Sequence, residues 1–210
     1  MSLRTGLILV GILLVFLVSK TLGYEAVRVH GAAMAPAIKD GQYVLAAKWP
    51  YGYNRYSIPR HLPVLPVQKP GVVPNRGDIV VFVHPLKRSG IHVSRVIGLP
   101  GETIQIKSGL VILEEQQLPS ESVALPNDMD LSPRPERAFV EILPNGKSHM
   151  ILDIEVGSEV DNTDAIKIPQ GHVFVMGDNR DNSKDSRAQE HGVVPLEAVF
   201  GRVDHFLYTL

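Results

Sequence analysis

The sequence predicts a mainly β protein whose globular part follows one N-terminal transmembrane helix. Behind residue 24, short apolar runs alternate with Pro and Gly, which is typical of strands joined by turns. No segment there shows the 3.6-residue apolar periodicity of a long amphipathic helix. The first residues instead form a nearly continuous apolar stretch. These three observations favour a mainly β globular part behind a membrane anchor.

The amino-terminal stretch has the composition of a membrane span. Gly6–Val18 carries no charge and is rich in Leu, Ile and Val. Extension through Lys20 to Tyr24 gives a length near the ~20 residues that cross a bilayer. Lys20 can then reach the membrane surface while Tyr24 lies at the interface. The alternative is a secretory leader removed after Thr21-Leu22-Gly23, and of the two we expect a retained anchor.

The rest of the chain is predicted to consist mostly of strands. The predicted strands are Ala26–Val29, Gln42–Ala46, Asp78–His84, His92–Leu99, Thr103–Lys107, Gly109–Leu113, Ala138–Leu143, His149–Ile154 and His172–Met176. Pro144-Asn145-Gly146 predicts a hairpin turn, and Pro100-Gly101 separates two strands. Asn54–Asn75 is rich in proline and Gln116–Arg137 is polar, so both are predicted as loops.

Composition narrows the range of functions. The 210 residues suit one globular unit, or a core with an inserted subdomain. The formal net charge of -1 and the lack of a basic run predict no nucleic-acid partner. The absence of cysteine excludes a disulfide scaffold, a thiolate metal site and a cysteine nucleophile. Because the histidines also lack metal-site spacing, we expect neither a metal nor a cofactor.

One polar segment stands out near the carboxyl end. Gly177–Arg187 reads Gly-Asp-Asn-Arg-Asp-Asn-Ser-Lys-Asp-Ser-Arg and follows the apolar run Val173–Met176, which predicts a buried strand. Its residue types favour a sharp turn with side chains bonded to the backbone, although a solvated loop is the alternative for any such run. Further motif-like segments precede it: Gly31–Pro36 (Gly-Ala-Ala-Met-Ala-Pro), Lys48–Tyr53, Arg76–Phe82 and Ser94–Glu102.

In this order, the segments resemble the signature boxes of the type I signal peptidases. These are membrane-anchored serine endopeptidases of peptidase family S26 that remove leader peptides from secreted preproteins. The resemblance extends from about Val27 to Val203, and Lys48–Tyr53 is similar to Gram-negative members. It implies an antiparallel β core interrupted by a smaller inserted β subdomain. The implied division is an anchor in residues 1–24, a core in 25–102 and 170–210, and an insertion in 103–169.

The resemblance also implies a location. A member of this family is held in the cytoplasmic membrane by a single pass, and its globular part lies on the periplasmic or extracytoplasmic side. The lipid bilayer is therefore an expected partner of this chain. Because the boxes resume directly behind the apolar stretch, the resemblance favours the retained anchor over a removed leader.

The two positions that carry the family's chemistry are occupied by other residues here. In the family, a serine before Met-x-Pro attacks the scissile carbonyl, and a lysine before Arg-Val-Ile-Gly accepts its proton. The matching residues are Ala33 and Ser94. A methyl group cannot be a nucleophile, and a serine hydroxyl cannot replace a lysine amine whose pKa is lowered toward neutrality. The usual dyad is therefore predicted to be absent.

Residues that frame the family's dyad are still present. Met34 and Pro36 preserve the local geometry at residue 33, whose main-chain N–H could still donate into an oxyanion hole. Ser183 matches the serine that orients the family's lysine, and Asp185 and Arg187 match a supporting salt bridge. The other framing residues are Arg95, Gly177, Asp178 and Asn179. The alternative is that five of these residues now only hold the turn, namely Gly177, Asp178, Asn179, Asp185 and Arg187.

The family's cleft binds its substrate as an added strand. This implies a peptide site along Gly31, Ala32, Ala33, His92, Val93 and Ser94. His92 and Ser94 share one face of a strand, with Cα atoms ~6.6 Å apart, so a Ser94 nucleophile with His92 as base is conceivable. Side chains at that spacing rarely reach hydrogen-bonding distance, and His30 is a further weak candidate base.

Three functional hypotheses follow. The first is a pseudoenzyme that binds preprotein or leader-peptide segments in extended form without cutting them. The second is an active signal peptidase with unusual catalytic residues. The third is a structural or regulatory partner of an active paralogue. The intact framing residues around two missing catalytic groups favour the first.

Overall fold

The computed structural model describes residues 4–12, 23–57, 72–84, 90–125, 131, 134–154 and 157–207. Within these residues the fold is mainly β, and the named strands pair antiparallel in three sheets, which confirms the predicted class. Residues 4–12 form a helix. Behind residue 23, the described part contains only two 3-10 helices, η1 (Trp49–Tyr51) and η2 (Leu196–Ala198), so the expected lack of long amphipathic helices is confirmed there.

The largest sheet has the strand order β1-β2-β14-β3-β4-β12-β13. Its strands are β1 (Tyr24–Arg28), β2 (Tyr43–Ala47), β3 (Ile79–Val83), β4 (Ile91–Gly98), β12 (His172–Met176), β13 (Val194–Pro195) and β14 (Val199–Leu207). Strands from both ends of the globular part thus share one sheet, which brings the loop behind β12 close to the loop behind β1.

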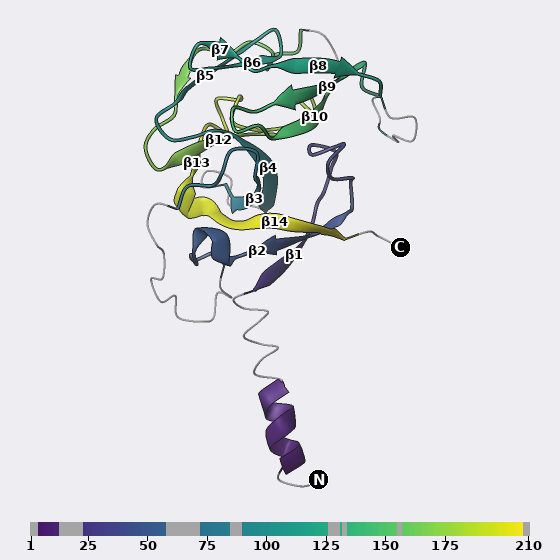
Figure 1. Cartoon of the computed structure of the whole chain (residues 1–210), viewed down its shortest axis with the longest axis vertical. Helices are drawn as coiled ribbons and strands as arrows, with labels where there is room; N and C mark the ends of the chain where they lie inside the picture. The colour runs from purple at the N-terminus through teal and green to yellow at the C-terminus, as the bar shows by residue number, and fades with distance from the viewer. Residues whose placement is uncertain are drawn as a thin grey trace.

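Two smaller sheets use the middle of the chain. One has the order β11-β5-β6-β7 and the other β10-β9-β8. Their strands are β5 (Thr103–Lys107), β6 (Leu110–Leu113), β7 (Gln116–Gln117), β8 (Ser120–Val123), β9 (Arg137–Ile142), β10 (Ser148–Asp153) and β11 (Ile166–Lys167). Figure 1 shows these sheets together at one end of the globular part, with β1, β2 and β14 at the other. The division into a core and an inserted subdomain stays a prediction, although the strands separate along similar bounds.

Both faces of the large sheet are covered, which explains the unbroken apolar runs of its inner strands. In β3, Val81 packs in one cluster with Val44 and Phe200. Its neighbour Val80 points to the opposite face and packs in a cluster with Val96. A third cluster joins the large sheet to β5 and β6, with members that include Ile97, Phe174, Met176, Ile104 and Ile106. The large sheet is therefore the rigid support of the molecule.

Part of one edge of β4 is left unpaired by its two neighbouring strands. On one side, β3 pairs with β4 along Ile91–Arg95, with Val80 opposite Ser94. On the other side, β12 pairs only with the second half of β4, at Arg95, Val96 and Gly98. No strand of the described chain pairs with the second edge of Ile91–Ser94.

All nine predicted strands have observed counterparts with ends shifted by at most a few residues. The hairpin turn at Pro144-Asn145-Gly146 is also confirmed, because Gly146 N–H donates to Leu143 O at 2.9 Å between β9 and β10. The prediction of a loop over Gln116–Arg137 is wrong in part, since β7 and β8 lie within it. These strands are short and polar, so the sequence carries no apolar alternation there.

The predicted strands also omit β11, β13 and β14, and β14 is the longest strand of the described chain. It carries Gly201, Arg202, Asp204 and His205, and its register shifts against both β2 and β3. These polar residues and irregularities hide its periodicity in the sequence. Of the predicted loop Asn54–Asn75, residues 54–57 and 72–75 carry no helix or strand, and residues 58–71 lie outside the described part.

The predicted anchor is described only in its first half. Residues 4–12 are helical, while Lys20 and the segment 13–22 lie outside the described residues. Among the described helices, none combines the length and the apolar character that a membrane crossing requires.

Candidate functional site

A pocket of about 320 Å³ lies beside the open edge of β4. Three segments line it: Arg28–Met34 from the last residue of β1 onward, Ile91–Ser94 in β4, and Asn182–Lys184 in the loop behind β12. The six residues predicted to form a peptide site, namely Gly31, Ala32, Ala33, His92, Val93 and Ser94, are all among its lining residues. Arg28, Asn182 and Lys184 also line it, and sequence analysis did not select them.

Backbone geometry gives this pocket an edge that can accept a strand. Val96 exchanges hydrogen bonds with the chain in front of β3, because Gly77 N–H donates to Val96 O at 2.8 Å and Val96 N–H donates to Asp78 O at 2.9 Å. Backbone groups alternate in direction along a strand, so those of Val93 and Ile91 point away from β3. They face the side of β4 that β12 does not reach. Main-chain donors and acceptors are therefore available along the pocket.

The segment around Ala33 forms the opposite wall. Ala35 N–H donates to Ala32 O at 3.0 Å, and Ile38 N–H donates to Met34 O at 2.9 Å, so the segment is a compact turn. Met34 is fully buried and anchors this turn in the core with Ile38. The N–H of Ala33 itself donates to no acceptor among the described residues. Ala33 thus contributes to the pocket lining, and its backbone N–H is left unused among the described residues.

The loop behind β12 is held against this turn by a close backbone approach. Asn179 N–H donates to Ala33 O at 3.0 Å. At Gly177, an added Cβ would lie 2.5 Å from Ala33 O and 2.4 Å from Ser183 Oγ, so only glycine fits there. This contact places Ser183 beside Ala33.

An ion pair within the loop holds its shape. Arg187 donates through Nε to Asp185 Oδ1 at 2.8 Å and through Nη2 to Asp185 Oδ2 at 2.8 Å. Arg187 Nη2 also donates to the carbonyl oxygen of Arg180, and Asp185 Oδ2 accepts the N–H of Gly177 at 3.0 Å. Both side chains are buried. The expected pairing of Asp185 with Arg187 therefore stabilises the turn that carries Ser183.

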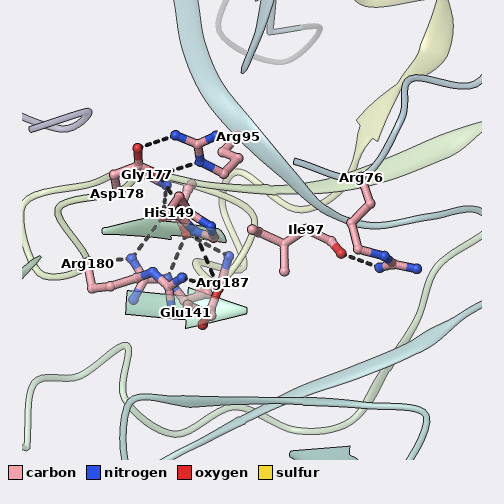
Figure 2. A network of polar contacts seen from close by, with 10 residues as sticks. Arg76, Arg95, Ile97, Glu141, His149, Gly177, Asp178, Arg180 and Arg187 are labelled. Atoms are coloured by element: carbon pink, nitrogen blue, oxygen red, sulfur yellow. Dashed lines mark hydrogen bonds and ion pairs between the residues drawn. The ribbon is translucent and has the colours of Figure 1, made fainter. Parts of the chain in front are cut away.

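A second buried group of charges lies behind the loop and joins it to other strands (Figure 2). Arg95 in β4 donates to both carboxylate oxygens of Asp178, at 2.7 and 2.6 Å. Arg180 donates to Glu141 in β9 at 2.8 Å. The imidazole of His149 in β10 lies between the two pairs, with Nε2 3.5 Å from Glu141 Oε1 and 3.9 Å from Asp178 Oδ1.

Two arginines and two carboxylates balance in this cluster, which leaves no net negative charge to hold a proton on His149. Burial is the largest cause that lowers the pKa of His149, and the nearby Arg95 and Arg180 lower it further, to about 2. Burial raises the pKa of Asp178 above its ordinary value, against the opposing effect of Arg95. Sequence analysis missed Glu141, His149 and Arg180. For Glu141 and His149 the only signal was a polar side chain at an inward-facing strand position, whereas Arg180 lies in the loop behind β12.

The chemically reactive candidates do not form a catalytic pair in this geometry. Ser94 is buried, and its hydroxyl hydrogen bonds to no described residue, His92 included. The ring of His92 instead stacks on Phe82, with centroids 5.5 Å apart. The hydroxyl of Ser183 likewise has no hydrogen-bond partner in the described part of the chain. His30 lines the pocket from the exposed end of the Ala33 segment. No group of three or more metal-ligating side chains occurs among the described residues.

Comparisons of the sequence with known proteins identify relatives from one family. The family described as "Signal peptidase, peptidase S26" matches residues 2–208. A signal peptidase I from Rickettsia canadensis is 31% identical over 194 residues, covering 88% of this chain and 72% of the relative. One from Rickettsia typhi is 31% identical over 207 residues, covering 94% and 77%. A solved signal peptidase I from Enterococcus faecalis is 26% identical and covers 62% of this chain and 97% of its own, with a TM-score of 0.37.

Replacement of His149 by glutamine tests the charge state of the buried cluster. The unfolded chain binds a proton at the ordinary histidine pKa of 6.5, whereas the folded chain binds it only near pH 2. Stability from this residue is therefore complete above about pH 6.5 and declines as the pH falls below it. As the pH falls below this value, we expect the unfolding free energy of the parent chain to decrease relative to that of His149→Gln. The decrease is up to about 1.4 kcal/mol for each pH unit.

The measurement is chemical denaturation of both chains between pH 7 and pH 4.5. Asp153, whose pKa burial raises to about 6, is present in both chains, and its contribution therefore cancels in the difference. His205→Gln, which removes an exposed histidine, is the matched control. A difference between the parent and His149→Gln that stays constant over this range would contradict a neutral, buried His149.

Proposed function

Because the chain belongs to the signal peptidase family, peptidase S26, we propose that it binds leader-type peptides in the pocket beside Ala33 without cleaving them. The observation that carries this proposal is the combination of an open strand edge with a methyl group at the position that matches the family's nucleophile. Binding and cleavage need different groups, and this chain keeps those for binding.

Peptide binding by strand addition needs main-chain groups and small side-chain pockets. The free edge at Ile91 and Val93 supplies the first, and Ala32, Ala33 and Val93 give the pocket a largely apolar wall. The unused N–H of Ala33 supplies one further donor. These features support a ligand that is extended and carries small side chains, such as the Ala-x-Ala end of a leader peptide.

Peptide cleavage needs a nucleophile and a base within hydrogen-bonding reach of each other. Ala33 offers neither a lone pair nor a proton at its side chain. Ser94 and Ser183 carry hydroxyls, but neither is hydrogen bonded to a basic side chain of the described chain. This arrangement supports binding without hydrolysis, and it speaks against Ser94 with His92 as a substitute pair.

The proposal includes a single membrane anchor, with the pocket on the extracytoplasmic side of the cytoplasmic membrane. It is supported by family membership and by the uncharged apolar stretch Gly6–Val18. The partners are then the bilayer and preprotein or leader-peptide segments, while pairing with an active paralogue stays a prediction.

Alkaline carbonate extraction of membranes tests the anchor. We expect the full chain to stay with the membrane pellet, because transfer of an apolar span into water is strongly unfavourable. A matched chain that lacks residues 1–22 is expected in the supernatant. Release of the full chain by carbonate would contradict the anchor.

Restoring both missing groups tests the loss of catalysis. We expect the purified, detergent-solubilised chain to leave a labelled preprotein uncut. The double variant Ala33→Ser with Ser94→Lys should cleave it at least about a hundredfold faster, since a general base alone contributes that much. The readout is the appearance of the mature protein on a gel over time.

The single variants Ala33→Ser and Ser94→Lys, purified in the same way, are the controls. A contaminating host peptidase would give all four preparations the same rate. Cleavage by the unmodified chain that disappears in Ser94→Ala or His92→Ala would overturn the proposal and establish an unusual catalytic pair. If the double variant does not cleave the preprotein, the fold does not place residues 33 and 94 for catalysis, and this prediction is wrong.

A further inference from the structure

We propose that the pocket selects peptides that end in a free carboxylate at the Ala33 position, and that Lys184 and Arg28 supply the charge that recognises it. This inference rests on the proposed function, because it names the ligand class of the same pocket. Its preferred ligand is a released leader peptide, or another peptide with the same small-residue end, and not an uninterrupted chain.

The charged side chains that line the pocket are basic. Arg28 and Lys184 both line the pocket, and its lining residues include no Asp or Glu. Lys184 is exposed, and no described residue forms an ion pair or hydrogen bond with it. Its neighbour Asp185 cannot neutralise it, because that carboxylate is buried and bonded to Arg187 and to Gly177 N–H. The pocket is therefore positively charged at the end where the loop behind β12 closes it.

The carboxylate of Asp40 is bonded to the backbone at the start of the opposite wall. Asp40 Oδ1 accepts the N–H of Gly31 at 2.8 Å, which fixes the start of the turn. Gly31 has a positive φ of 79°, a conformation that favours glycine, so this bond and the turn belong together. The guanidinium of Arg28 lies 5.9 Å from the centre of the Tyr43 ring, a contact that leaves its charge uncompensated.

The pocket lining also contains uncharged hydrogen-bond donors. The N–H of Ala33, the hydroxyl of Ser94 and the hydroxyl of Ser183 all belong to lining residues, and none donates to an acceptor in the described part of the chain. A carboxylate offers two oxygens that can accept several such bonds, whereas a peptide carbonyl offers one. Hydrogen bonds to a charged acceptor are also roughly twice as strong as neutral ones. This donor set therefore favours a chain end over a continuing peptide bond.

Substitution of the dyad positions makes room for the same ligand. At residue 33 the methyl group is smaller than a serine side chain, and at residue 94 the hydroxymethyl group is much shorter than a lysine side chain. The second oxygen of a carboxylate can use the space that these changes leave. Loss of the catalytic groups and gain of carboxylate recognition are then two results of the same substitutions.

Fluorescence anisotropy on the full chain in detergent tests this inference. The probe is the peptide Leu-Leu-Gly-Ala-Leu-Ala with a dye at its amino end, prepared as the free acid, as the carboxyl-terminal amide, and with Ser-Gly added behind the last Ala. We expect the acid to bind about 10- to 100-fold more tightly than the other two at low salt, because only it places a charge beside Lys184. Lys184→Gln should reduce that preference to about threefold or less.

Lys107→Gln removes another exposed charge, at the end of β5 and outside the pocket lining, and is expected to keep the full preference. Equal binding of acid and amide would overturn the carboxylate inference while leaving the proposed function intact. A preference for the acid that survives Lys184→Gln would overturn the role of Lys184. Failure of all three peptides to bind would overturn the proposed function itself.

Discussion

The hydrogen bond from Asn179 N–H to Ala33 O joins the two chain segments on which the pocket depends. It forms only because Gly177 lets the backbone approach Ala33 and Ser183 to within a distance that any Cβ would block. The Asp185–Arg187 pair then fixes the curvature of the loop, and Met34 fixes the opposing turn in the core. A pocket built by such mutual constraints can persist without a catalytic dyad, since none of these contacts uses one.

The buried charges extend this constraint into the rest of the fold. Through Arg95 and Asp178, the loop is tied to β4, and through Arg180 and Glu141 it is tied to β9. Removal of one partner of a buried ion pair leaves an uncompensated charge and is therefore strongly destabilising. The polar residues of the loop thus have a structural role that does not depend on a catalytic dyad.

The strands with unbroken or alternating apolar residues could be predicted from the sequence, because burial of one or both faces leaves that pattern. The strand β14 could not, since its polar residues and register shifts follow from pairing with β2 and β3. For the pocket, resemblance to a family located Ala33 and Ser94, but Lys184 was missed because only the three-dimensional loop brings it to the same pocket. The pairing of Glu141 in β9 with Arg180 in the loop behind β12 could not be predicted either, because local sequence does not show which distant residue a buried charge contacts.

The proposed function requires that an extended peptide adds to the free edge of β4 opposite Ala33. The first measurement is residue-resolved amide hydrogen exchange, with and without a saturating Ala-x-Ala peptide acid. We expect slower exchange at the N–H groups of Ile91, Val93 and Ala33, with no change along the outer edge of β1, the terminal strand of the same sheet. Protection of the β1 edge, or of neither edge at saturation, would contradict it.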